Sequence, residues 1–266
     1  MAVDITLLKK LRDATFAPLW DCKQALEETN GDFDQAQEIL RKKWILKAGK
    51  KAERETNEWL VKLVQKDGWL AGIKLLCETD FVAKNETFTE LIDTLLEKVI
   101  SHKSEVINLE SIDAGLLESL NTTIAEFIGK IWENVQIWDV ILNNKTAFVY
   151  NHPWNKVASI IYYQWSDDNW IAKELALQVA AMNPTYLSFE DISADEKEKL
   201  LAEYRAEMAT SGKPENMIEQ IIEGKLKKTL WESVLLEQEY IRDWGKKVKE
   251  LISGDFVVNG FVRLSI

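Results

Sequence analysis

The sharpest local signal in the sequence is the segment CETDFVAKN at residues 77–85. It follows an apolar run typical of a strand and precedes a helical pattern, so it presents an acid, Asp80, and an aromatic, Phe81, where a strand gives way to a helix. One interpretation is structural: Thr79 or Asp80 caps the helix and Phe81 packs on the sheet. The other is functional: Phe81 protrudes as a rigid wedge with a large contact area for another protein.

The rest of the sequence offers little for catalysis. The two histidines, His102 and His152, are far apart, and His102 ends a helical pattern where the helix dipole favours a cation. No serine lies in a GxSxG elbow, and no GxxxxGK phosphate loop occurs. Glu78 with Asp80 as an acid–base pair is the weakest hypothesis, because carboxylates in so acidic a chain usually form a solvated face. We expect no enzyme, no cofactor and no metal site.

Composition narrows the class of partner. The 266 residues include 33 Lys and Arg against 44 Asp and Glu, a net charge of -11, which disfavours nucleic acid and favours a protein partner. Two cysteines, Cys22 and Cys77, form no CxxC pair, so neither a disulfide framework nor a zinc site is indicated. The first residues lack the order of a signal peptide, and no apolar stretch approaches the ~20 residues of a membrane span. We expect a cytoplasmic protein.

Residues 1–46 read as a domain of three short helices. Apolar residues recur at helical spacing, the stretch 15–18 breaks the first helix, and Asn30-Gly31 ends the second. Asp32 is then placed to cap the third helix. The basic, polar residues 47–58 are expected to form a helical or partly flexible linker.

Residues 59–143 and 144–266 read as the two halves of an α+β core. Asp67-Gly68 between two strand-like runs is a strong hairpin signal. The order hairpin then helix occurs twice, which predicts two halves of similar design with antiparallel sheets. Strands are expected at 60–64, 70–77, 134–142, 146–150 and 156–163, and helices at 86–102, 116–130 and 167–182.

An inserted helical hairpin is expected at residues 188–230. Two amphipathic stretches flank the tight reversal at 211–214 and would form antiparallel helices that project from their domain. Their narrow apolar stripe suits packing on their own core, and it equally suits a partner or a second copy of the chain, so a homodimer through this hairpin remains open. The stretch 256–266 is expected to close the fold as a strand, or as a hairpin around Asn259-Gly260.

Six motifs together resemble the bacterial elongation factor Ts family, in order and over nearly the whole chain. They are LRDAT at 11–15, DCKQAL at 21–26, NGD at 30–32, RKK at 41–43, CETDFVAKN at 77–85 and SGKP at 211–214. The resemblance implies an N-terminal three-helix ubiquitin-associated-like domain, a two-part α/β core and a projecting helical hairpin. It also implies a non-covalent guanine nucleotide exchange factor in translation elongation, which binds the GTPase elongation factor Tu with GDP and promotes GDP release so that GTP can bind.

The resemblance also implies which residues contact that GTPase. The segment intruding beside its magnesium and phosphate-loop site would be Thr79, Asp80, Phe81 and Val82. Further contacts would be Lys9, Arg12, Leu19, Trp20, Ile131, Trp132 and His152. The alternative function is a helical adaptor that binds peptide or nascent-chain helices through the N-terminal domain.

Tryptophan and glycine usage is unusual. The chain has 11 glycines where average usage predicts roughly 19, and it has 11 tryptophans. Five tryptophans stand where the resembled family carries glycine: Trp44, Trp59, Trp132, Trp154 and Trp165. One hypothesis is that UGA codons, which specify glycine in some reassigned genetic codes, have been translated as tryptophan, and the alternative is genuine substitution.

Overall fold

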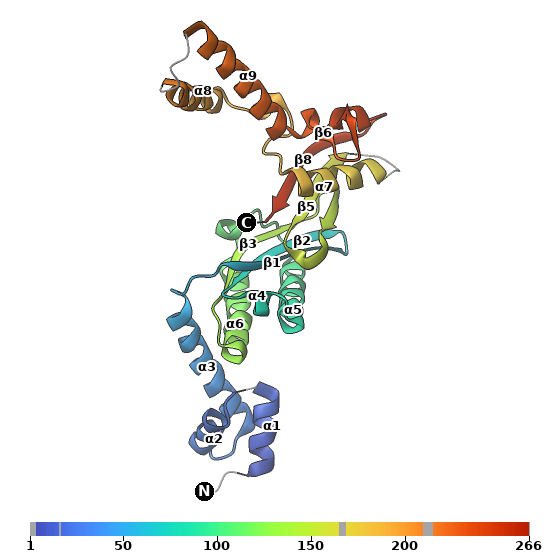
Figure 1. Cartoon of the computed structure of the whole chain (residues 1–266). Helices are drawn as coiled ribbons and strands as arrows, with labels where there is room; N and C mark the ends of the chain where they lie inside the picture. The colour runs from blue at the N-terminus through green and yellow to red at the C-terminus, as the bar shows by residue number, and fades with distance from the viewer. Residues whose placement is uncertain (1–3, 16, 165–168, 210–214, 266) are drawn as a thin grey trace. The chain divides into compact units, whose positions relative to one another are not determined.

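The computed structural model describes residues 4–15, 17–164, 169–209 and 215–265, and its chain divides into two compact units (Figure 1). Unit 1 comprises Met1–Asn144, Pro153–Lys156 and Ser265–Ile266, and unit 2 comprises Lys145–His152 and Val157–Leu264. Helices and antiparallel sheets occur in both, which confirms the α+β class. None of the helices in the described part of the chain has the length and apolarity that a bilayer crossing needs.

Unit 1 begins with three helices, α1 (Ile5–Thr15), α2 (Leu19–Glu28) and α3 (Phe33–Lys51). They enclose a small core in which Leu11, Leu26 and Leu40 are almost fully buried. The chain reverses between α2 and α3 through the left-handed pair Asn30 and Gly31, and the Asp32 carboxylate then accepts the Gln35 N–H at 2.9 Å as the predicted cap. Helix α3 continues through the first part of the expected linker.

The sheet of unit 1 has the order β1–β2–β3 and is antiparallel throughout. Strands β1 (Glu58–Lys66) and β2 (Trp69–Cys77) meet at the predicted Asp67-Gly68 turn, where both residues have positive φ, as a two-residue hairpin turn requires. Strand β3 (Val135–Asn143) pairs with β2. Helices α5 (Glu86–His102) and α6 (Ala114–Ile131) lie on one face of this sheet, as Figure 1 shows.

The core of unit 1 fills the space between that sheet and the helices. Phe88 and Ile92 of α5, and Leu120 of α6, are almost completely buried against the strands. The rings of Phe88 and Phe127 lie 5.8 Å apart between centroids. This packed platform supports the segment 78–85, which runs from β2 through the one-turn helix α4 (Asp80–Ala83) into α5.

Unit 2 has the same design as unit 1: two strands form a hairpin, a third strand pairs antiparallel with the second of them, and a helix covers the sheet. Its sheet has the order β4–β5–β8, from strands β4 (Ala147–Asn151), β5 (Ala158–Gln164) and β8 (Val257–Leu264), and α7 (Trp170–Met182) packs against it (Figure 1). Strand β8 is the expected closing strand. The hairpin expected as its alternative is wrong, because Asn259 is an extra residue bulged out of the pairing between β5 and β8.

The expected helical hairpin corresponds to α8 (Ala194–Ala209) and α9 (Glu215–Ser233), and its turn at 210–214 lies outside the described residues. The Tyr204 and Thr229 hydroxyls share a hydrogen bond of 2.7 Å between the two helices. A short hairpin of β6 (Glu239–Tyr240) and β7 (Asp243–Lys247) follows, which the sequence did not predict. It is held by two buried polar residues of α7, Glu174 and Gln178.

Candidate functional site

The segment 78–85 is a corner built from two helix caps in succession. Thr79 has extended backbone, and its hydroxyl accepts the Val82 N–H at 3.4 Å, which begins α4. One turn later the Asn85 side chain accepts the Thr87 N–H at 3.0 Å, which begins α5. Because α4 has only one turn, some of its side chains face the core of unit 1 and the others face solvent.

Phe81 occupies the outward position. Its side chain is 82% exposed, whereas Ala83 is buried and Val82 packs partly against the core of unit 1. The interpretation that Phe81 packs on the sheet is therefore wrong, while the cap at Thr79 is present. An exposed phenyl ring on a short, capped helix is accessible to another molecule, and a large apolar side chain gains from being covered.

Asp80 provides a charge beside this ring. Lys84 donates to the Asp80 carboxylate at 2.7 Å, and this hydrogen bond is the main reason that the pKa of Asp80 lies below its ordinary value. The carboxylate is 46% exposed and carries its negative charge at neutral pH. Phe81 and Asp80 thus present an apolar ring and a fixed anion on the same turn.

A reciprocal set of hydrogen bonds holds the corner, and we name it the corner clamp: Glu78, Thr79, Glu133 and Asn134. The Glu133 carboxylate accepts the Thr79 N–H at 3.1 Å and its hydroxyl at 2.7 Å. In the opposite direction, the Glu78 carboxylate accepts the Asn134 N–H at 2.6 Å. The chain at the end of β2 and the chain just before β3 therefore each accept a backbone N–H of the other.

The clamp also reaches the segment after α3. Asn134 is almost fully buried, and its side-chain amide donates to the Arg54 carbonyl at 2.9 Å. The Arg54 guanidinium in turn donates to Glu78 at 3.3 Å. The segment after α3, the end of β2 and the start of β3 are thus joined by hydrogen bonds next to α4. The sequence indicated Glu78, inside the motif at 77–85, only as an acid, and it gave no role to Glu133, which directly follows the predicted contact residues Ile131 and Trp132.

The Cys77 thiol at the corner is not activated as a nucleophile. Burial, assisted by the nearby Glu133 charge, raises the pKa of Cys77 to about 12, so the thiol stays protonated. The thiol instead donates a hydrogen bond to the Thr79 carbonyl, with 3.4 Å between Sγ and the oxygen. Within the described residues, no three His, Cys, Asp or Glu side chains are grouped as a metal site requires.

The other predicted contact residues fall into three places. Lys9, Arg12, Leu19 and Trp20 are exposed on α1 and at the start of α2, with Trp20 at 72% exposure. Ile131 and Trp132 end α6, directly before the clamp residue Glu133, and the Lys51 ammonium lies 5.0 Å from the Trp132 ring centroid.

His152 belongs to unit 2. It is exposed, and its Nδ1 lies 2.8 Å from the Tyr150 hydroxyl. The predicted residues of unit 1 and this histidine are therefore on different units.

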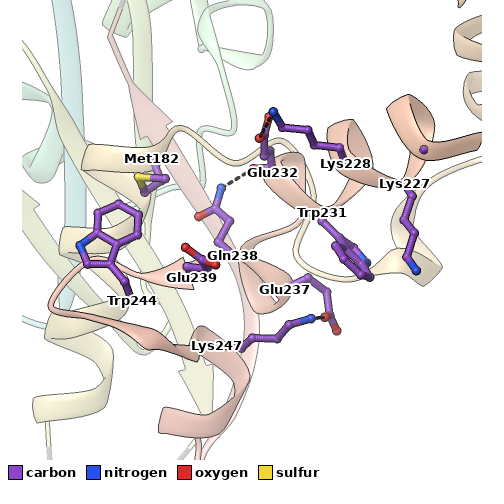
Figure 2. A pocket seen from close by; sticks show the side chains of 11 residues that line it. Met182, Lys227, Lys228, Trp231, Glu232, Glu237, Gln238, Glu239, Trp244 and Lys247 are labelled. Atoms are coloured by element: carbon purple, nitrogen blue, oxygen red, sulfur yellow. Dashed lines mark hydrogen bonds and ion pairs between the residues drawn. The ribbon is translucent and has the colours of Figure 1, made fainter. Parts of the chain in front are cut away.

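A cavity of about 520 Å³ lies in unit 2 at the base of α9, lined by Trp231, Trp244 and Met182 together with charged side chains (Figure 2). Burial alone would raise the pKa of Glu237, but hydrogen bonds from Lys247 at 2.5 Å and from Lys249 at 2.8 Å lower it overall. Figure 2 shows Lys247 reaching this carboxylate. The acid is engaged in ion pairs and is not poised as a base.

Comparison with known proteins connects this architecture to one family. The family model described as "Elongation factor TS" matches residues 78–266. A protein named "Elongation factor Ts" from Hydrogenobaculum sp. (strain Y04AAS1) is 39% identical over 273 residues, covering 100% of this chain and 99% of the relative. Proteins with the same name from Porphyromonas gingivalis and Aquifex aeolicus (strain VF5) are 34% and 36% identical, with coverage of 100% and 95% of this chain and of 99% and 92% of those relatives.

Proposed function

Because the chain belongs to the elongation factor Ts family of translation elongation factors, we propose that it promotes nucleotide exchange on the GTPase elongation factor Tu in the cytoplasm. The observation that carries this proposal is the 82% exposed ring of Phe81 on a short helix held by the corner clamp. No bond is made or broken by this chain in the proposed reaction.

The chemistry of a GTPase site explains how one wedge suffices. Such a site holds its diphosphate through backbone amides and through Mg²⁺, which binds few protein ligands and keeps several waters. A small displacement of that shell weakens nucleotide binding. We propose that Phe81 inserts next to this shell with Thr79 and Val82 flanking it.

The fixed charge of Asp80 has a separate effect. A carboxylate brought near bound Mg²⁺ competes electrostatically with the phosphate and carboxylate groups around the ion. Lys84 holds that carboxylate in place at 2.7 Å before the partner arrives. The wedge therefore displaces backbone while the anion disturbs the ion.

Thermodynamic linkage completes the proposal. If the chain binds the nucleotide-free GTPase more tightly than the GDP-bound form, GDP must bind the complex more weakly by the same factor. Release then accelerates, and GTP enters the emptied site. The contacts proposed for Lys9, Arg12, Leu19, Trp20, Ile131 and His152, and for the chain at position 132, supply affinity for the partner rather than the displacement itself.

The test is release of labelled GDP from elongation factor Tu. Phe81→Ala is expected to lower the exchange rate by about 30-fold or more, because a central aromatic contact is worth about 2 kcal/mol or more. Trp244→Ala is the matched control, since Trp244 is also exposed, at 62%, but lies on β7 of unit 2. Equal rates for Phe81→Ala and the unmodified protein would refute the wedge.

The exposure of Leu19 and Trp20 favours the second candidate, a helical adaptor that binds peptide helices through the N-terminal helices. The two functions respond differently to substitution. For an adaptor, Trp20→Ala abolishes peptide binding and Phe81→Ala has no effect. For an exchange factor, Phe81→Ala is the more damaging change in the GDP assay.

A further inference from the structure

Two tryptophans adopt a backbone conformation that suits glycine. Trp132 has φ 64° and ψ 14°, and Trp154 has φ 72° and ψ 3°. In this left-handed region the Cβ of an L residue crowds the following carbonyl oxygen, a clash that glycine lacks. The other non-glycine residues with positive φ in the described part of the chain are Asn30, Asp67, Lys103, Asn155 and Asn183. Four of these five are Asn or Asp, which tolerate the conformation, so the exceptions are Lys103 and the two much bulkier indoles.

Trp132 occupies the position at which helices commonly end with glycine. Its N–H donates to the Ile128 carbonyl at 3.0 Å, and its left-handed turn leads the chain out of α6 into Glu133. The indole is 55% exposed, so burial compensates little for the strain. The turn leads directly into Glu133, whose carboxylate accepts two hydrogen bonds from Thr79.

Trp154 shows the same left-handed conformation in a different loop. It lies between β4 and β5, in the turn Pro153–Asn155, and its side chain is 84% exposed. An indole that remains in water gains almost nothing from packing. The backbone there again requires a conformation that costs tryptophan more than glycine.

The remaining suspected positions differ. Trp44 is helical and 5% exposed, with its ring close against Gly129, and Trp59 lies in β1 and donates to the Lys156 carbonyl at 2.7 Å. The backbone therefore singles out 132 and 154, and Trp165 lies outside the described residues. The glycine hypothesis for Trp44, Trp59 and Trp165 stays a prediction from the sequence.

We propose that the functional protein carries glycine at positions 132 and 154, because the codons there are UGA triplets that its own translation system reads as glycine. The shortage of glycine, 11 against roughly 19 expected, and the 11 tryptophans agree in direction with this proposal. The proposal concerns the residues of the chain and does not depend on the exchange function.

The direct experiment reads the codons and the native peptides. UGA at both positions, together with native peptides lighter by the mass of the missing indolylmethyl group, is the expected result. UGG codons, or native peptides that contain tryptophan, overturn the proposal. Mass spectrometry of protein purified from the source cells gives this answer without any activity measurement.

A stability experiment tests the structural argument separately. Trp132→Gly and Trp154→Gly are each expected to raise the folding equilibrium constant about 2- to 5-fold, since relief of the left-handed strain exceeds the added freedom of the unfolded chain. Trp132→Ala removes the indole but keeps the Cβ, so it should give no such gain. Trp138→Gly, at an exposed strand position of β3, should lower the constant about 5-fold.

Urea unfolding followed by far-ultraviolet circular dichroism suits this series, because the substitutions alter tryptophan fluorescence. Opposite signs for Trp132→Gly and Trp138→Gly are the expected signature. If Trp132→Gly is no more stable than Trp132→Ala, left-handed strain at position 132 does not lower the stability of the protein, and the structural basis of the proposal fails.

Discussion

The clearest test of how the site is positioned is Glu133→Ala, which removes the Thr79–Glu133 half of the corner clamp without touching the exposed ring. The substitution leaves the N–H and the hydroxyl of Thr79 without the carboxylate that accepts both at 3.1 and 2.7 Å. Phe81 and Asp80 remain in the chain. Any loss of exchange therefore reports on the order of the corner and not on the loss of a contact group.

The magnitude follows from the two hydrogen bonds. Bonds to a charged group contribute about 1.5–3 kcal/mol each, and both partners here are only partly buried, so about 1 kcal/mol each is reasonable. Glu133→Ala should therefore lower the free energy of unfolding by about 2 kcal/mol. Glu133→Gln keeps one acceptor and should cost about 1 kcal/mol.

Glu133→Ala is expected to slow exchange by weakening the affinity of the protein for its GTPase partner. If the corner must become ordered when the partner binds, that free energy is subtracted from binding, and about 1.4 kcal/mol corresponds to tenfold. The concentration of Glu133→Ala that half-saturates GDP release should rise about 10- to 30-fold. Glu118→Ala is the matched control, since Glu118 is an exposed carboxylate on α6, the helix that ends just before Glu133.

Two results would refute this reasoning. One is a Glu133→Ala protein that loses the expected stability but keeps its half-saturating concentration, because the clamp would then be structural only. The other is an equal loss in Glu118→Ala, which would show a general effect of removing a carboxylate from unit 1.

Other groups near the corner and in unit 2 give measurable outcomes. Thr79→Ser should keep both the cap of α4 and the hydroxyl's bond to Glu133, whereas Thr79→Ala loses both and should lower the free energy of unfolding by about 2 kcal/mol in urea. Equal effects of the two substitutions would contradict these roles of the hydroxyl. Cys77 should resist iodoacetamide at about pH 8 in the folded protein and react after unfolding, as peptide mass spectrometry can show. Because its pKa is raised from 9.0 to about 12, the neutral thiol's contribution to stability is complete below pH 9 and is lost as the pH rises toward 12. Glu174→Ala removes the carboxylate that accepts the Tyr240 hydroxyl at 2.7 Å and the Arg242 guanidinium at 2.8 Å, and should cost about 2 kcal/mol. Hydrogen exchange should then rise in β6 and β7, and a uniform rise in both units would contradict this assignment.

Local patterns in the sequence predicted much of the fold. The helix expected at 86–102 has those bounds in the structure, and Asp67-Gly68 forms the hairpin turn. Such features depend on periodicity and on turn residues, which are properties of neighbouring positions. The β6–β7 hairpin escaped prediction because it is charged, and its buried Tyr240 is bonded to Glu174 of α7, 66 residues earlier in the chain.

The site shows the same division. The capping hydroxyl of Thr79 could be predicted from its place between strand and helix, but the exposure of Phe81 could not, since packing and protrusion gave the same pattern. Glu133 lies 54 residues after Thr79, and no local signal joins a carboxylate to a backbone donor at that separation. The family resemblance indicated glycine at position 132, but no local pattern in the sequence predicted the left-handed backbone that Trp132 adopts.

The separation of 54 residues between Thr79 and Glu133 has a consequence for the order of events during synthesis. A polypeptide leaves the ribosome from its N-terminus, so the turn bearing Phe81 emerges well before the carboxylate that steadies it. The growing polypeptide cannot fix that turn until α6 is complete and has emerged. A shortened product that ends within α6 would therefore display a loose Phe81 and would compete poorly with finished molecules for the same GTPase.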